Sequence, residues 1–97
     1  MKATTLQLII SEKLQAEFEP DILSVIDESF KHADHNPDAA QGGTHFRVKI
    51  VSKRFKGVSK VERHRWVYAI LHDEMKAGLH ALALTTQDSD ESTGTLA

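Results

Sequence analysis

Apolar and polar positions repeat with two different periods along the chain, and each period predicts a different kind of element. After a capping box formed by Thr4 and Gln7, apolar residues recur at helical spacing, which predicts a helix from Thr5 to about Phe18. Pro20 ends this helix, because the residue before a proline is kept out of the helical region.

The next segments have the composition of two strands joined by a long loop. Residues 21–30 are rich in β-branched and apolar side chains and too short for a separate helix, which predicts a first strand. Residues 31–44 contain Asn-Pro-Asp and Gly-Gly, as a loop does, and loops of this length are usually functional or disordered. Residues 45–52 alternate between apolar and polar side chains, which predicts a strand with one polar face. Its apolar face carries Phe46, Val48 and Ile50.

A second helix and a last strand follow. Ser59 and Glu62 form another capping box, and the helical pattern runs to about Ala77 before Gly78 ends it. Residues 79–86 form the predicted third strand. The predicted buried face of the helix consists of Val61, His64, Val67, Tyr68, Leu71 and Met75, with Trp66 on the opposite side.

The order helix, strand, strand, helix, strand predicts an α+β fold, α-β-β-α-β, in which a three-stranded sheet carries its helices on one face. We expect residues 1–86 to form one domain, since 97 residues leave no room for a second core. Residues 87–97 contain no cation and few apolar side chains, which predicts a disordered tail.

Composition limits the kinds of metal site, location and catalytic activity that we expect. The chain has no cysteine, so a metal would need histidine, aspartate, glutamate or a ligand lent by a partner. No apolar run approaches membrane length and the first ten residues do not resemble a signal peptide, so we expect a cytoplasmic protein without a membrane partner. None of the common catalytic or nucleotide-binding motifs is present, which makes an enzyme the weakest interpretation.

Positive charge is concentrated in one stretch although the formal net charge is only -2. Residues 47–65 hold eight cations against the single anion Glu62, whereas the rest of the chain holds four cations against thirteen anions. Such segregation is evidence about partners rather than about the fold. It is typical either of a solvated strand face and helix edge or of a surface that docks nucleic acid or an acidic protein. Trp66 is equally well interpreted as a partner anchor or as a lid over a neighbouring segment.

The histidines allow a metal site without requiring one. His32 and His35 stand in the loop with H-x-x-H spacing, and His80 opens the last strand just after Gly78. A convergent pair such as His32 and His80 would supply half of a coordination shell for zinc, copper or iron. The alternative is that these are ordinary surface histidines, and we expect His64 to be a hydrogen-bonded core histidine.

The pattern "HFRVKIVSKRFKGVSKVERHRWVYAIL", followed by "EMKAGLHALALTT" and preceded by "DESFKH", resembles the BolA family. The resemblance implies a class II KH-like fold and a monothiol glutaredoxin partner that shares a bridging [2Fe-2S] cluster, with glutathione completing the ligands. It implies His80 as one cluster ligand and His32 as the second, with His35 as a competitor for the loop position. Two imidazoles in place of thiolates should raise the cluster's reduction potential and make it sensitive to pH.

Other BolA-family members are described as transcriptional regulators, which keeps a nucleic-acid function open as the alternative. KH domains that bind nucleic acid use a G-x-x-G loop, whereas this chain has Gly-Val-Ser-Lys at residues 57–60. We therefore expect a non-enzymatic glutaredoxin partner or, alternatively, a DNA-binding regulator that uses the basic stretch; whether the free protein forms a homodimer is left open. The predicted docking residues are Arg47, Lys49, Lys53, Arg54, Lys56, Lys60, Arg63, Arg65 and Trp66.

Overall fold

The computed structural model describes residues 5–29, 44–79 and 81–90, which include all of the elements predicted from the sequence. The helices are α1 (Thr5–Phe18), the short 3-10 helix η3 (Lys53–Phe55), α2 (Lys60–Ile70) and α3 (His72–Lys76), and the strands are β1 (Ile22–Asp27), β2 (His45–Val51) and β3 (Ala81–Gln87).

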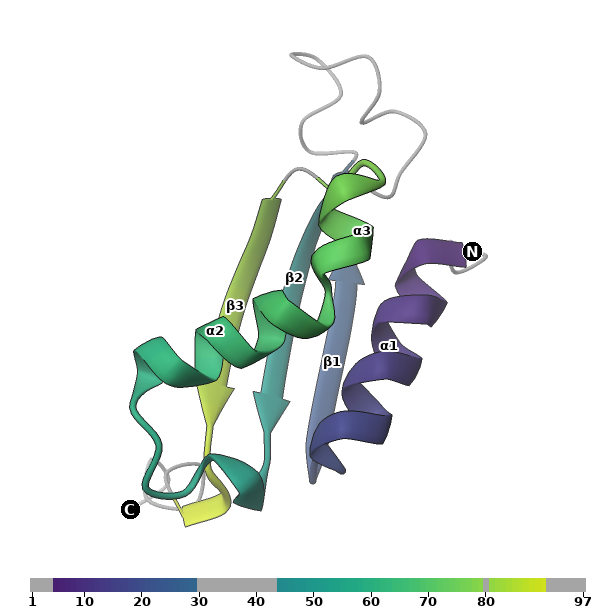
Figure 1. The fold of residues 1–97 in the computed structure, drawn as a ribbon. Coiled ribbons are helices and arrows are strands. Elements are labelled where there is room, and N and C mark those ends of the chain that lie inside the picture. Colours follow the sequence, from purple (N-terminus) through teal and green to yellow (C-terminus); the bar gives the residue numbers. More distant parts are fainter. Residues whose placement is uncertain (1–4, 30–43, 80, 91–97) are drawn as a thin grey trace.

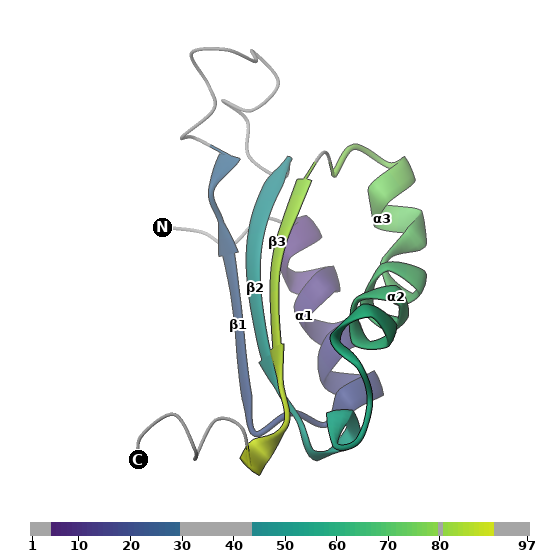
Figure 2. The same cartoon turned by 90° about the vertical axis from the view of Figure 1, so that its left-hand side faces the viewer.

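The three strands form one sheet in the order β1-β2-β3, with β2 in the middle. β1 runs antiparallel to β2, and β3 runs parallel to β2. All the helices cover the same face of this sheet, as Figures 1 and 2 show, and the opposite face of the described sheet carries no helix. The predicted α+β fold is confirmed.

The predicted alternation along β2 is confirmed and explains how the sheet meets its helices. Phe46, Val48 and Ile50 are at most 2% exposed and face the helices. Arg47 and Lys49, between them, are exposed on the opposite face. Each large apolar side chain buried in this way contributes about 1.5–3 kcal/mol of transfer free energy, so the register of β2 is strongly specified.

Helix α1 has the predicted bounds, and its buried face matches the sequence pattern. Ile10, Leu14 and Phe18 are at most 3% exposed and pack into the core. Glu19 follows in a left-handed backbone conformation, with a φ of 42°, and so ends the helix one residue before Pro20.

The prediction of one long helix from Ser59 to Ala77 is wrong, because the helix is broken at Leu71. Leu71 has φ −96° and ψ 15°, and α3 leaves α2 at a clear angle in Figure 1. The start predicted from the cap is correct: the Ser59 hydroxyl accepts the backbone N–H of Glu62. Leu71 is fully buried, so the break turns the chain around a core side chain.

The predicted buried face of the second helix is also wrong in part. Val61 is 62% exposed and Tyr68 is 39% exposed, and His64 is only half-buried. Val67 is buried as predicted, and the other buried side chain on α2 is Arg63. The pattern failed because Arg63, a charged residue that hydrophobic periodicity does not count, occupies the buried position.

The described domain extends beyond the predicted boundary at Thr86. β3 includes Gln87, and Asp88 is only 9% exposed. The Ser89 hydroxyl donates to the Asp21 carboxylate, and Asp90 lies 3.1 Å from Lys56. The packed domain therefore reaches at least residue 90, and the remainder of the predicted tail, residues 91–97, lies outside the described residues.

Candidate functional site

Three segments of the chain meet at the end of the sheet where β2 begins, which we call the ligand end. The Glu28 N–H, just after β1, donates to the His45 carbonyl oxygen at 2.8 Å. The Ala81 N–H, at the start of β3, donates to the Thr44 carbonyl oxygen at 3.1 Å. The chain that leaves β1 and the chain that enters β3 are therefore bonded to His45, the first residue of β2, and to Thr44 just before it. α3 lies at this end of the sheet as well (Figure 1).

Ser29 links the end of β1 to the start of β2. Its side chain is fully buried, and its Oγ accepts the backbone N–H groups of Thr44 at 2.9 Å and His45 at 3.1 Å. The same hydroxyl donates to Asp27 Oδ1, which also accepts the Ser29 N–H at 2.9 Å. Both described ends of the predicted loop, Ser29 and Thr44, are thus held in one hydrogen-bonded network.

His45 is a further imidazole at the ligand end, on the strand for which the sequence predicts one polar face. Its Nδ1 lies 2.8 Å from Thr44 Oγ1, and the side chain is half-buried. Because the next residue, Phe46, faces the core, His45 faces the side of the sheet without helices.

The sequence analysis missed the Ser29 network entirely. The signal that could have found it is the Asp-Glu-Ser sequence at residues 27–29, directly after a strand, because Asp and Ser side chains commonly bond to nearby backbone N–H groups at turns. The hydrogen bonds that this network forms with Thr44 and His45 join residues far apart in the sequence, so no local sequence pattern predicts them.

The three predicted metal ligands, His32, His35 and His80, lie outside the described residues. His32 follows Ser29 by three positions in the chain, and His80 directly precedes Ala81. The structure brings Ser29 and Ala81 to the same end of β2. Within the described part of the chain there is no group of three or more side chains suited to hold a metal.

Five of the eight cations predicted to dock a partner are paired with carboxylates. Glu62 is the only one of these carboxylates that belongs to the basic stretch, so the fold offsets much of the charge segregation seen in the sequence. The pairs are Arg47–Glu28 at 3.2 Å, Arg54–Glu19, Lys56–Asp90 at 3.1 Å, Arg63–Asp88 at 3.9 Å and Arg65–Glu62 at 2.8 Å.

Arg63 differs from the other cations because it is inside the protein. Its side chain is 5% exposed, its Nε donates to the Val58 carbonyl oxygen at 2.8 Å, and its guanidinium carbon lies 5.6 Å from the centre of the Phe55 ring. A partner cannot reach this guanidinium, so we leave Arg63 out of the docking surface.

Apart from Arg65, which is paired with Glu62 on α2, the remaining docking cations fall into two groups. Arg47 and Lys49 stand on the sheet face without helices, whereas Lys53, Arg54, Lys56 and Lys60 follow the end of β2 that is opposite to the ligand end. Lys49, Lys53 and Lys60 form no ion pair with the described residues, because the carboxylates near this stretch pair with the other five cations.

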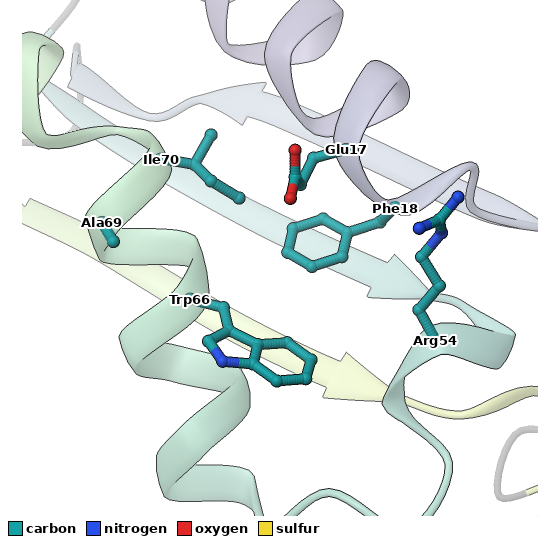
Figure 3. A pocket seen from close by; sticks show the side chains of 6 residues that line it. All are labelled: Glu17, Phe18, Arg54, Trp66, Ala69 and Ile70. Carbon is teal, nitrogen blue, oxygen red and sulfur yellow. The ribbon is translucent and has the colours of Figure 1, made fainter.

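Trp66 stands apart from both groups. Its indole is stacked on Phe55, with ring centres 6.4 Å apart, and the residue is 39% exposed. It therefore covers a core residue and still presents a surface to solvent. With Arg54 and four other residues it lines a pocket between α1 and α2 (Figure 3).

A family model described as BolA-like protein matches residues 14–91 of the chain. The chain belongs to the BolA-like family. This BolA-like chain is 47% identical over 83 residues to Protein BOLA1, chloroplastic, of Arabidopsis thaliana, covering 84% of the chain and 52% of that protein. It is 42% identical over 85 residues to the DNA-binding transcriptional regulator BolA of Escherichia coli strain K12, covering 88% of the chain and 77% of that protein.

Solved structures agree with this membership. The BolA domain of SufE1 from Arabidopsis thaliana superposes with a TM-score of 0.83 at 42% identity, covering 93% of this chain and 99% of that one. This BolA-like chain spans about half the length of the chloroplastic BOLA1 and 23% of SufE-like protein 1 from the same plant.

No helix in the described residues is both long and apolar enough to span a bilayer. Two relatives carry chloroplastic or mitochondrial designations in their names, so the cytoplasmic location of this chain stays a prediction.

Proposed function

We propose that this BolA-like chain is a non-enzymatic partner of a monothiol glutaredoxin and that the two proteins share a bridging [2Fe-2S] cluster. The observation that carries the proposal is the ligand end: Glu28 and Ala81 are bonded to the neighbouring residues His45 and Thr44, where β2 begins. Two histidine-bearing segments, far apart in the sequence, are thereby attached to one end of the sheet.

The donor chemistry fits such a cluster. A [2Fe-2S] cluster needs four ligands, and two imidazoles can replace two thiolates on one iron. With no cysteine in the chain, His80 and His32 would be its ligands, with His35 as the competitor, and the glutaredoxin and glutathione would supply the thiolates. When bound, the cluster would provide one-electron chemistry with a potential set by its ligands.

The chain's own contribution is to hold the two attachment points in place. Ser29 and Thr44 stand at the two described ends of the segment that contains His32, and the buried Ser29 hydroxyl bonds to Thr44. Residues that orient metal ligands commonly matter nearly as much as the ligands themselves. Ser29 is therefore a positioning residue in this proposal.

The position of the ligand end also limits which of the predicted docking residues a glutaredoxin would contact. A glutaredoxin bound there would meet α3 and the beginning of β2, whereas Lys53, Lys56 and Lys60 lie beyond the other end of β2. We therefore propose that the glutaredoxin contacts α3 and the beginning of β2 rather than the lysines around η3. The two ends of the domain can then serve different partners.

The experiment combines this protein, a monothiol glutaredoxin and glutathione, and records visible absorption and circular dichroism of the purified complex. We expect a cluster spectrum that is lost or altered in His80→Ala. His32→Ala and His35→Ala, compared side by side, identify the loop ligand, and His64→Ala, on α2 and outside the proposed glutaredoxin contact, is the matched control. A cluster spectrum unchanged by His80→Ala would contradict the ligand assignment, provided that far-ultraviolet circular dichroism shows the variant to be folded.

A DNA-binding regulator is the second candidate, and it is favoured by two observations. The matched proteins of Escherichia coli, Haemophilus influenzae and Vibrio cholerae are each named DNA-binding transcriptional regulator BolA. In this chain Lys49, Lys53 and Lys60 have no ion pair with the described residues and so are available to phosphates. Because Lys53 and Lys60 lie away from the ligand end, DNA and a glutaredoxin would not compete for the same surface.

A further inference from the structure

The pocket in Figure 3 lies between the C-terminal part of α1 and α2, and η3 closes one side. Its volume is about 540 Å³, in the range of sites that hold small ligands or side chains. The lining residues are Glu17, Phe18, Arg54, Trp66, Ala69 and Ile70.

The aromatic side chains of the pocket pack against one another and against the core. Phe18 is 3% exposed and its ring centre lies 4.9 Å from that of Phe55, which in turn stacks on Trp66. The rings of Phe18 and Trp66 both border the pocket, so an entering apolar group meets aromatic surface on two sides (Figure 3). Such rigid aromatic walls are typical of the anchor sites of protein interfaces.

The charges around the pocket favour a cation. The Glu17 carboxylate points into the pocket in Figure 3 and forms no ion pair with the described residues. Arg54, on the opposite side, is already paired with Glu19. The lining therefore carries the carboxylate of Glu17, which has no ion pair with the described residues, and a guanidinium that Glu19 already pairs. The basic sequence around Arg54 suggested the opposite.

We propose that this pocket binds a segment of a partner protein in which an apolar side chain stands next to a lysine or arginine. The apolar side chain would lie on Phe18 and Trp66, and the neighbouring cation would meet Glu17 and the indole face. A cation over the face of a tryptophan ring is attracted by the electrons of the ring, and a nearby carboxylate adds to this attraction.

If the pocket binds a basic segment, Trp66 is not part of the predicted nucleic-acid surface. A polyanion that approached Trp66 would meet Glu17 and Glu19, whereas a basic segment would not. The pocket also lies away from the ligand end, because Arg54 follows the last residue of β2 and His45 begins that strand. The inference therefore stands whether or not a cluster is bound.

The chain's single tryptophan is in the pocket, so intrinsic fluorescence reports on binding at this site. The probes are three blocked dipeptides, acetyl-Phe-Lys-amide, acetyl-Phe-Gln-amide and acetyl-Phe-Glu-amide, which share the phenylalanine and carry a positive, a neutral and a negative second side chain. We expect the lysine peptide to bind about fivefold more tightly than the glutamate peptide at low salt. Glu17→Gln should abolish this preference, and Glu12→Gln, on an exposed position of the same helix, should retain it.

Three results would overturn the proposal: equal binding of the three peptides, tighter binding of the glutamate peptide, or a lysine preference that survives Glu17→Gln. 2-Phenylethylammonium distinguishes a free amine from a protein segment. If it quenches Trp66 fluorescence and none of the peptides does, the occupant is a small amine and the protein partner is excluded. Nitrogen-15 NMR shifts in Trp66→Phe, which keeps an aromatic wall, provide a readout that does not depend on fluorescence.

Discussion

The buried Ser29 hydroxyl accepts the backbone N–H of Thr44 at 2.9 Å, so one side chain joins two described residues that are 15 positions apart in the sequence. The same oxygen accepts the His45 N–H, which means that one hydroxyl serves two backbone donors of β2 and its approach. Removing it would leave both donors without this acceptor in a place that water reaches poorly.

We therefore predict that Ser29→Ala lowers the free energy of unfolding by about 1–3 kcal/mol, measured by urea denaturation. Ser24→Ala, on the sheet face without helices, should change it by less than about 0.5 kcal/mol. In the mixed complex with a glutaredoxin, the Ser29 variant should also lose its cluster spectrum faster than the wild-type protein. Equal stabilities of the two serine variants would show that the network at the ligand end contributes little.

A second prediction concerns the contact that holds α3 against α1. Lys13 Nζ lies 2.9 and 2.8 Å from the two carboxylate oxygens of Glu74, whose side chain is 9% exposed. Lys13→Met leaves this carboxylate without its cation and should destabilise the protein by about 2 kcal/mol. The double variant Lys13→Met, Glu74→Gln should lose less unfolding free energy than the two single variants lose together. We expect a coupling free energy above about 0.5 kcal/mol in this double-mutant cycle. Additive effects would mean that the ion pair does not fasten α3.

Arg63 and Arg65, two residues apart, should respond very differently to the same substitution. Arg63→Met removes hydrogen bonds to the carbonyl oxygens of Val58 and Thr86 and the pairing with Asp88, so we expect a loss of about 2–3 kcal/mol in thermal or urea unfolding. Arg65 is 72% exposed in its side chain, and Arg65→Met should cost less than about 0.5 kcal/mol. Similar losses for the two variants would contradict the structural role of Arg63.

The DNA-binding candidate makes a prediction about salt. If Lys53 and Lys60 contact phosphates, their joint replacement by alanine should reduce the slope of log affinity against log salt by about 1.8, because each neutralised phosphate contributes about 0.9. Asp90→Asn, which releases Lys56 from its ion pair, should instead strengthen binding at low salt. Fluorescence anisotropy with a labelled duplex measures both effects. A slope that these lysines do not change would remove the proposed contact surface.

Local patterns determined most of the fold. The capping boxes, the alternation along β2 and the apolar spacing of α1 each act within a few residues, and the structure confirms α1, β2 and the start of α2 that they predict. The break at Leu71 and the burial of Arg63 were missed because both depend on what the second helix meets: a core side chain in the first case, and Val58, Thr86 and Phe55 in the second.

For the site, the sequence by itself determined the types of residue available: no cysteine, a few histidines and a stretch crowded with cations. Only the tertiary structure decided which of them meet. It attached the segments after Glu28 and before Ala81 to the same strand, and it paired the cations with acids from distant positions. The physical reason is that hydrogen bonds and ion pairs depend on distance in space, and the pairing of the strands sets that distance for residues that the sequence keeps far apart.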